Sequence, residues 1–206
     1  MTARFGWMAK AMSRKRVAIL ISGRGSNMAA LIEAAKDPAY PAEISLVLAN
    51  VPGAGGLATA KAVGIATEVV DHKLFGKDRA AFEQALQAVL AKYKIEIVCL
   101  AGFMRILTAD FVAKWQGRML NIHPALLPQF KGLDTHRRAL EAKVKQHGAT
   151  VHFVMPEMDS GPIILQDAVE VRPDDTEATL AARVLAVEHR IYPQALKMLA
   201  EGRCRL

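Results

Sequence analysis

The sequence has few cysteines and no long apolar run. Cys99 and Cys204 are the only cysteines among 206 residues. Two are too few for the disulfide framework of a small secreted protein, so a reducing cytoplasm is expected. No apolar stretch approaches the ~18 residues that a membrane-spanning helix needs. The patterns H-E-x-x-H and G-x-S-x-G are also missing, which argues against a zinc peptidase and a serine esterase. We therefore expect a cytoplasmic protein that has no metal site and binds no membrane.

Acidic residues are missing from both ends of the chain. Five of the 27 Lys and Arg lie in residues 1–16 and two more are Arg203 and Arg205, whereas all 20 Asp and Glu lie between these ends. The net charge of +7 therefore comes from the termini, and a basic face for nucleic acid is not indicated. Residues 1–16 lack the apolar core of a secretory signal. We expect a flexible basic extension there, with a transit peptide as the alternative, and a single domain over 17–206.

Short apolar runs alternate with helical patterns through the first part of the chain. Strands are expected at 17–22, 44–49, 66–70, 95–101 and 118–122. Helices are expected between them, over 26–37, 55–63, 78–93 and 108–115. This order indicates a doubly wound, mainly parallel sheet that is covered by helices on both faces.

The pattern changes in the last third of the chain. After a helix over 134–143, strands at 149–155 and 162–171 follow each other with only a turn between. This predicts an antiparallel hairpin at one edge of the sheet. Asp174 and Glu177 have the spacing of a capping box for a last helix, which would reach about Ala200 with a disturbance at Pro193.

Asn121 and His123 stand at the end of the fifth expected strand. Strand side chains alternate between faces, so these two point the same way while Ile122 points to the other face. An amide can donate to a developing oxyanion, and an imidazole can move a proton near neutral pH. The alternative is an ordinary strand end with a hydrogen-bonded histidine, because a motif this short has many chance matches.

A glycine-rich loop, Gly23 to Asn27, directly follows the first expected strand and opens the first helix. Backbone amides in such a loop can bind a phosphate. Met28 stands where a dinucleotide fingerprint needs a third glycine, and Asn50 stands where it needs an acid. One phosphate group is therefore favoured over NAD; the alternative is a tight turn that uses glycine for its geometry.

Two further loops offer partners for this chemistry. Residues 101–107 follow the fourth strand at its C-terminal end, where doubly wound sheets bind ligands. Their apolar side chains could form a slot for a flat ring, or they could simply cover the core. Asp159 stands in an ordinary turn position before Ser-Gly-Pro. Alternatively, its carboxylate faces His123 and favours the protonated imidazole.

Five motifs in this order resemble the phosphoribosylglycinamide formyltransferases. They are ISGRGSN (21–27), LAGFMRIL (100–107), NIHPALLPQFKGLDTH (121–136), HGATVHFV (147–154) and MDSGPIILQ (158–166). The resemblance runs from Val17 nearly to the C-terminus, and the set is specific although each motif alone is not. It implies transfer of a formyl group from 10-formyltetrahydrofolate to the amine of glycinamide ribonucleotide in purine biosynthesis, by a monomer or weak homodimer.

The same resemblance implies a role for each site residue. Asn121, His123 and Asp159 would be catalytic. The ribonucleotide would be bound by Gly25, Ser26, Asn27 and Glu188. The folate would be bound by Arg79, Met104, Arg105, Ile106, Leu107, Asn121, Met155, Pro156, Glu157, Met158 and Asp159. Residues 155–157 and Lys131 depart from the usual family pattern, which leaves side-chain contacts at 155–157 open.

Three other functions fit parts of the pattern. A methionyl-tRNA formyltransferase would need a further C-terminal domain and a basic surface, and a formyltetrahydrofolate deformylase would need an N-terminal regulatory domain. A phosphate-ligand sensor would need the fold alone. The combination of Asn121, His123 and Asp159 in one chain with a neutral body favours the small-molecule formyltransferase over all three.

Overall fold

The computed structural model describes residues 13–206. Most of the predicted basic extension lies outside these residues, but its end needs correction. Lys15 and Arg16 are the first residues of strand β1 (Lys15–Ile21). The Lys15 amide donates to the Pro41 carbonyl at 2.8 Å. The sheet thus begins before Val17, because polar residues at an exposed strand end still pair through their backbone.

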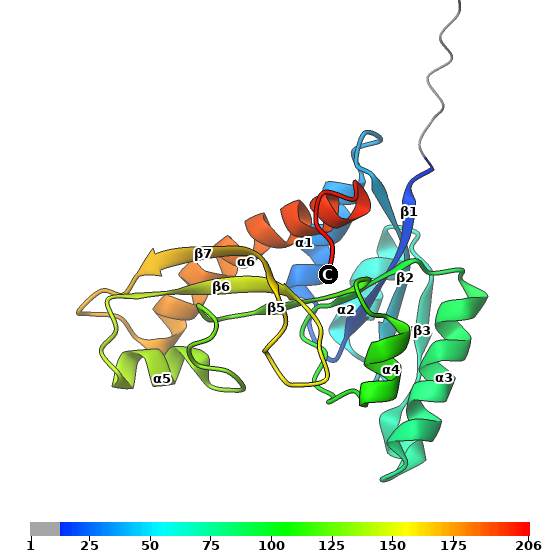
Figure 1. Ribbon diagram of the computed structural model, residues 1–206, viewed down its shortest axis with the longest axis horizontal. Helices are drawn as coiled ribbons and strands as arrows, with labels where there is room; N and C mark the ends of the chain where they lie inside the picture. The colour runs from blue at the N-terminus through cyan, green and yellow to red at the C-terminus, as the bar shows by residue number, and fades with distance from the viewer. Residues whose placement is uncertain (1–12) are drawn as a thin grey trace, which may run out of the picture.

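The elements alternate as the apolar runs predict (Figure 1). In chain order they are β1, α1 (Ser26–Ala35), β2 (Ala42–Ala49), α2 (Gly55–Ala62), β3 (Thr67–Val69), the 3-10 helix η1 (His72–Phe75), α3 (Arg79–Lys92), β4 (Ile97–Leu100), α4 (Ala109–Lys114), β5 (Met119–His123), α5 (Thr135–Glu141), β6 (Gln146–Phe153), β7 (Ile163–Glu170) and α6 (Glu177–Ala200).

The strands form one seven-stranded sheet in the order β3-β2-β1-β4-β5-β6-β7. β1 to β5 are parallel, and β6 runs antiparallel to both β5 and β7. The predicted doubly wound sheet and its edge hairpin are therefore confirmed. The pairing of β6 with β5 extends that prediction, and it determines which side chains meet at the end of β5.

Helices cover both faces of the sheet (Figure 1). Alternate residues of β1 pack in opposite layers: Ile19 lies in the cluster with α1, α2 and α6, and Leu20 in the cluster with α3 and α4. Each such fully buried aliphatic side chain contributes about 1.5–3 kcal/mol. Tyr192 of α6 is also fully buried, and its hydroxyl donates to the carbonyl of Leu100 at 2.9 Å. This bond fixes the longest helix against the end of β4.

Two local predictions are wrong. The capping box of α6 is formed by Thr176 and Thr179. Asp175 binds the Arg183 guanidinium and the Arg172 amide, and the helix begins only at Glu177, so Asp174 cannot cap it. In addition, α6 continues without interruption through Pro193, where a disturbance was expected. The loop that joins β6 to β7 covers 154–162.

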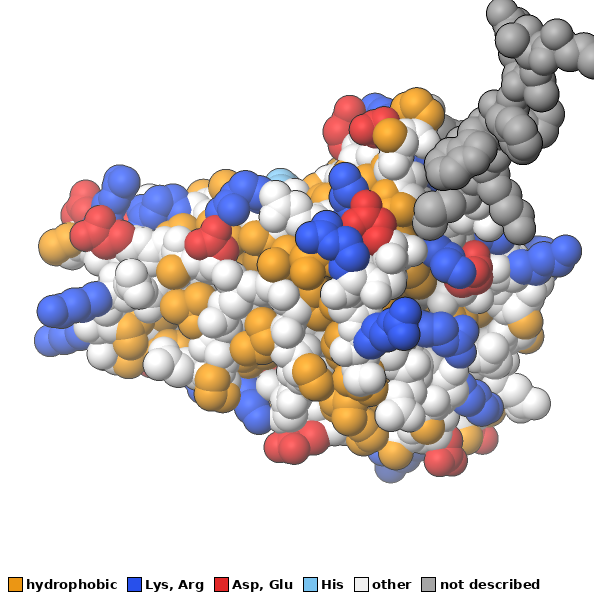
Figure 2. Space-filling model, turned by 45° about the horizontal axis from the view of Figure 1, so that its top comes forward, with side chains coloured by type: hydrophobic (Ala, Val, Ile, Leu, Met, Phe, Trp, Pro, Cys, Tyr) orange, Lys and Arg blue, Asp and Glu red, His pale blue; other side chains and the backbone are white. Residues whose placement is uncertain are grey.

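Charged side chains of both signs are interspersed over the face drawn in Figure 2, with apolar side chains between them. None of the helices within residues 13–206 combines the length and the apolar composition needed to cross a membrane.

Candidate active site

The pairing of β5 with β6 places Asn121 directly across from His152. Leu120 and Ile122 point into the core layer of α1 and α6, so Asn121 points to the other face of the sheet. There its amide Nδ2 lies 3.2 Å from Nε2 of His152. β4 ends at Leu100, which is the register partner of Asn121, so the segment after β4 begins beside this amide.

His123 is the last residue of β5, and its side chain is only 6% exposed. Its Nε2 donates to the carbonyl of Phe130 at 3.0 Å. Its Nδ1 lies 3.4 Å from Oδ2 of Asp159, whose side chain is 10% exposed. Each ring nitrogen therefore faces an oxygen acceptor. The Nδ1 contact is an ion pair when the ring carries a proton on both nitrogens.

Asp159 reaches this position through a strained loop. Its φ is +51°, and the φ of Phe130 is +53°, a left-handed conformation that is uncommon for residues other than glycine. The Gly132 amide donates to Asp159 Oδ2 at 2.9 Å, and the ammonium of Lys131 donates to Ser160. Such outliers persist only where surrounding contacts hold them, and they cluster at functional sites. The two loops therefore brace the carboxylate against the imidazole.

His152 is a site residue that the sequence analysis did not assign a role. Its Nδ1 donates to the carbonyl of Phe153 at 2.8 Å, so Nε2 of the neutral ring is free to accept from Asn121. Burial lowers the pKa of His152, which keeps the ring neutral. This acceptor fixes which way the Asn121 amide points. The signal that identifies His152 is the pairing of β5 with β6, because residues opposite each other in a ladder share a face.

The glycine-rich loop turns into α1 as predicted. Gly25 has a φ of +72°, and an added Cβ would come within 3.3 Å of the Gly56 Cα, so glycine is needed both for the backbone conformation and for the close approach of α2. Within the described residues, no side chain caps α1 and no acid stands in its first turn. The amide groups at the start of α1 are therefore left for an external anion.

Glu188 of α6 meets this loop from the other side. The Asn27 amide donates to its carboxylate, and Glu188 is 7% exposed. Burial raises the pKa of Glu188, and the bond from Asn27 opposes this effect. Oδ1 of Asn27 is buried without a hydrogen-bond partner in the described structure. Oδ1 of Asn27 and the carboxylate of Glu188 are therefore hydrogen-bond acceptors for a polar ligand beside the loop.

The residues predicted to bind folate fall into three groups. Met104 and Ile106 are 65% and 66% exposed in the loop after β4, whereas Leu107 is buried in the core and could offer only its backbone. Residues 155–159 follow β6, and their Met158 is 55% exposed beside Gly132. Arg79 is exposed in the first turn of α3. It lies four residues before Glu83. The Glu83 carboxylate accepts from the Thr108 amide at 2.6 Å, at the end of the loop after β4.

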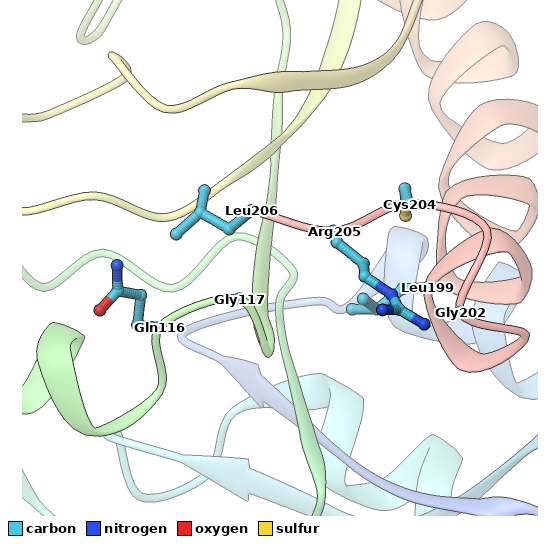
Figure 3. Close-up of a pocket in the computed structure, with 7 residues that line it drawn as sticks. All are labelled: Gln116, Gly117, Leu199, Gly202, Cys204, Arg205 and Leu206. Atoms are coloured by element: carbon cyan, nitrogen blue, oxygen red, sulfur yellow. The ribbon is translucent and has the colours of Figure 1, made fainter.

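A metal site and a second pocket are the other features to place within the described residues. Among residues 13–206, no group of three His, Cys, Asp or Glu side chains could hold a metal ion. A pocket shown in Figure 3 lies where the C-terminal tail meets the turn before β5. It is lined by Gln116, Gly117, Leu199, Gly202, Cys204, Arg205 and Leu206. This pocket is at the N-terminal end of β5, away from His123.

The chain is similar to known proteins over most of its length. Residues 15–196 match the formyl transferase family. The human trifunctional purine biosynthetic protein adenosine-3 is 51% identical over 193 residues, which are 94% of this chain and 19% of that protein. The chain thus spans about a fifth of the length of this curated relative.

Relatives of similar length to this chain also match most of it. Phosphoribosylglycinamide formyltransferase of Escherichia coli (strain K12) is 44% identical over 190 residues, covering 92% of this chain and 89% of that protein. The crystal structure of phosphoribosylglycinamide formyltransferase from Brucella melitensis is 54% identical with a TM-score of 0.88, covering 92% of this chain and 97% of that one. The extent of these matches, together with the fold, shows that the chain belongs to the formyl transferase family.

Proposed function

We propose that the protein transfers a formyl group from 10-formyltetrahydrofolate to the amine of glycinamide ribonucleotide in purine biosynthesis. The products are formylglycinamide ribonucleotide and tetrahydrofolate. The observation that carries this proposal is the cluster of Asn121, His123 and Asp159 at one strand end. It joins an oxyanion donor to an imidazole that faces a carboxylate, a combination suited to acyl transfer. The names of two relatives give phosphoribosylglycinamide as the formyl acceptor, and the folate donor is what the resemblance of the motifs implies.

The start of α1 supports a phosphate subsite for the ribonucleotide. Gly25, Ser26 and Asn27 bring uncapped amide groups and the positive end of the helix dipole to one place. Glu188 and the unpartnered Oδ1 of Asn27 are acceptors for the hydroxyl or amide groups of the same substrate. A monophosphate with a polar, neutral remainder fits this combination better than a dinucleotide does.

The loop after β4 supports a subsite for the folate ring. Met104 and Ile106 expose apolar side chains next to the strand that carries Asn121, and Met158 does so from the loop after β6. Backbone groups of Arg105, Leu107 and residues 155–157 are available for the ring nitrogens. Arg79 offers a positive charge for the acidic tail of the folate.

In the proposed reaction, the neutral amine of the ribonucleotide attacks the formyl carbon and negative charge develops on the formyl oxygen. Asn121 donates to that oxygen, while the imidazolium of His123 stabilises it and passes a proton to the departing folate nitrogen. Asp159 keeps the imidazole oriented and charged. The carbon–nitrogen bond to folate then breaks, and the extra proton of the attacking amine leaves the new amide and returns to His123, which restores the imidazolium. Holding both substrates together removes much of the entropic barrier, so no covalent enzyme intermediate is required.

An omission experiment tests this function. The protein is incubated with 10-formyltetrahydrofolate, with and without glycinamide ribonucleotide, and both tetrahydrofolate and the formylated product are measured. We expect tetrahydrofolate to form only when the ribonucleotide is present, in equal amount to the formylated product. Release of formate without the ribonucleotide would identify a hydrolase instead, and no reaction in either tube would leave a binding protein. The monomer or weak homodimer and the cytoplasmic location stay predictions.

A further inference from the structure

The hydroxyl of Ser22 joins two loops that the proposed function assigns to different substrates. Ser22 directly follows β1 and precedes the glycine-rich loop. Its Oγ donates to Oδ1 of Asn50 at 2.6 Å and accepts from the Met104 amide at 2.7 Å. The Ser22 amide also donates to the carbonyl of Gly102 at 3.1 Å. A residue of the phosphate loop region therefore holds the start of the folate loop at two points.

Asn50 fixes the direction of these bonds. It is only 1% exposed, just after β2, and its backbone amide donates to the carbonyl of Ile21 at 3.4 Å. Its backbone carbonyl accepts from Nδ1 of His72 at 2.8 Å. Because the side-chain oxygen of Asn50 is an acceptor, it takes the single proton of the Ser22 hydroxyl. The hydroxyl must then accept from Met104, so the backbone of the folate loop is positioned through Ser22.

The far end of the folate loop has a separate anchor. Glu83 of α3 is 6% exposed and accepts hydrogen bonds from both the amide and the hydroxyl of Thr108. This anchor belongs to the other layer, and within residues 13–206 no hydrogen bond joins Glu83 to the glycine-rich loop. Of the two ends, only the one at Met104 is tied to the phosphate subsite.

We propose that Ser22 is a positioning residue that couples the ribonucleotide subsite to the folate subsite. The inference rests on the proposed function, because that function makes these two loops substrate sites. Binding of the phosphate orders the loop at Gly25 and so the backbone at Ser22. The same hydroxyl then holds Met104 and its neighbours in the conformation that receives the folate ring. Such coupling is reciprocal: each substrate strengthens binding of the other by the same factor.

The test compares Ser22→Ala with Ser45→Ala, which removes a hydroxyl that binds only Glu43 on β2. Ser22→Thr keeps the hydroxyl and is the conservative variant. For each protein, KM for both substrates, kcat and the melting temperature are measured. The dissociation constant of tetrahydrofolate is measured with and without glycinamide ribonucleotide, and hydrogen exchange is measured at the Met104 amide.

In Ser22→Ala we expect KM for formylfolate to rise roughly tenfold, the order of magnitude for one lost hydrogen bond. KM for the ribonucleotide, measured with formylfolate well below its own KM so that coupling does not contribute, and kcat should stay within about threefold, and the Met104 amide should exchange faster. The strengthening of tetrahydrofolate binding by the ribonucleotide should disappear in Ser22→Ala and persist in both Ser22→Thr and Ser45→Ala.

Two results would overturn the proposal. If Ser22→Ala matches Ser45→Ala in folate KM and in coupling, Ser22 positions nothing. If Ser22→Ala lowers the melting temperature and weakens both substrates equally, with coupling unchanged, its role is only structural. In either case an active wild-type enzyme leaves the proposed function standing. A wild type that transfers no formyl group would remove the proposed function, and this inference with it.

Discussion

The carboxylate of Asp159 lies 3.4 Å from Nδ1 of His123, while the other ring nitrogen donates to the carbonyl of Phe130. These contacts join a strand end to two separate loops. They determine the direction of the imidazole ring. The first prediction follows from this pair.

Replacing Asp159 with Asn keeps the size of the side chain and removes its charge. Nδ1 of His123 then faces a neutral amide, and the imidazolium loses the counter-charge that favours it. We expect kcat to fall about a hundredfold or more, the usual range for impaired acid–base catalysis, with KM for glycinamide ribonucleotide nearly unchanged. Steady-state kinetics over pH 6–9 measures both. Asp167→Asn, which alters an exposed acid paired with Arg190, is the matched control; equal kcat in the two variants would contradict the role of Asp159.

The contact between His152 and Asn121 predicts effects that are not additive. Asn121→Ala removes the proposed oxyanion donor and should lower kcat on the order of a hundredfold. His152→Ala leaves the amide free to rotate, so a smaller loss, about tenfold, is expected. In the double variant the loss should equal that of Asn121→Ala alone, because His152 acts through the amide. Losses that simply multiply would show that His152 acts independently.

Glu188 should affect binding of one substrate more than turnover. It accepts from Asn27 beside the glycine-rich loop and is almost fully buried. Glu188→Gln replaces one acceptor oxygen with a donor, so a substrate group that it binds is left unpaired. We expect KM for the ribonucleotide to rise roughly tenfold, since a buried unpaired group costs about 1–3 kcal/mol, while kcat and the KM for formylfolate stay within threefold. Glu201→Gln at the far end of α6 provides the comparison, and a selective rise in the folate KM would reassign Glu188.

Acid should destabilise the fold through His147. Its ring is fully buried and packs edge-on against His136, with centroids 5.2 Å apart. Burial, followed by the neighbouring histidines His136 and His123, lowers the pKa of His147 from its ordinary 6.5 to about 4. The unfolded chain therefore binds the proton more readily between these values. The contribution of neutral His147 to the free energy of unfolding is fully present above pH 6.5. It is lost as the pH falls towards 4, by about 3 kcal/mol.

Urea unfolding at pH 7.5, 6, 5 and 4.5 measures this dependence. His147→Leu removes the titrating ring and should flatten the fall in the free energy of unfolding over the same interval. A variant that keeps the full slope of the wild type would show that other groups cause the acid sensitivity.

The sequence predicted the order of strands and helices because buried parallel strands are short continuous apolar runs and the helices carry their own caps, as at Asp78 and Thr108. Period-two alternation also placed Asn121 and His123 on one face. The turn position of Asp159 left open whether its carboxylate faces His123, and the resemblance favoured that pairing. The contact of His152 with Asn121 needed the register of β6 against β5, which the apolar pattern of β6 does not specify by itself.

Loop conformation limited the rest of the prediction. The carbonyl that holds Nε2 of His123 belongs to Phe130, and it points there because Phe130 adopts a left-handed φ that its residue type does not suggest. The bond from Met104 to Ser22 likewise depends on where the chain turns after β4. Neither is visible in a pattern of side chains, because the backbone carries half of each contact.

The central claim is that His123 carries out formyl transfer without holding the ribonucleotide. The most direct measurement compares wild type and His123→Ala in single-turnover formyl transfer from 10-formyltetrahydrofolate, alongside calorimetric binding of glycinamide ribonucleotide to each. We predict that transfer falls by at least about a hundredfold while the dissociation constant of the ribonucleotide changes less than threefold. Transfer at the wild-type rate, or loss of binding in proportion to the loss of transfer, would contradict the account.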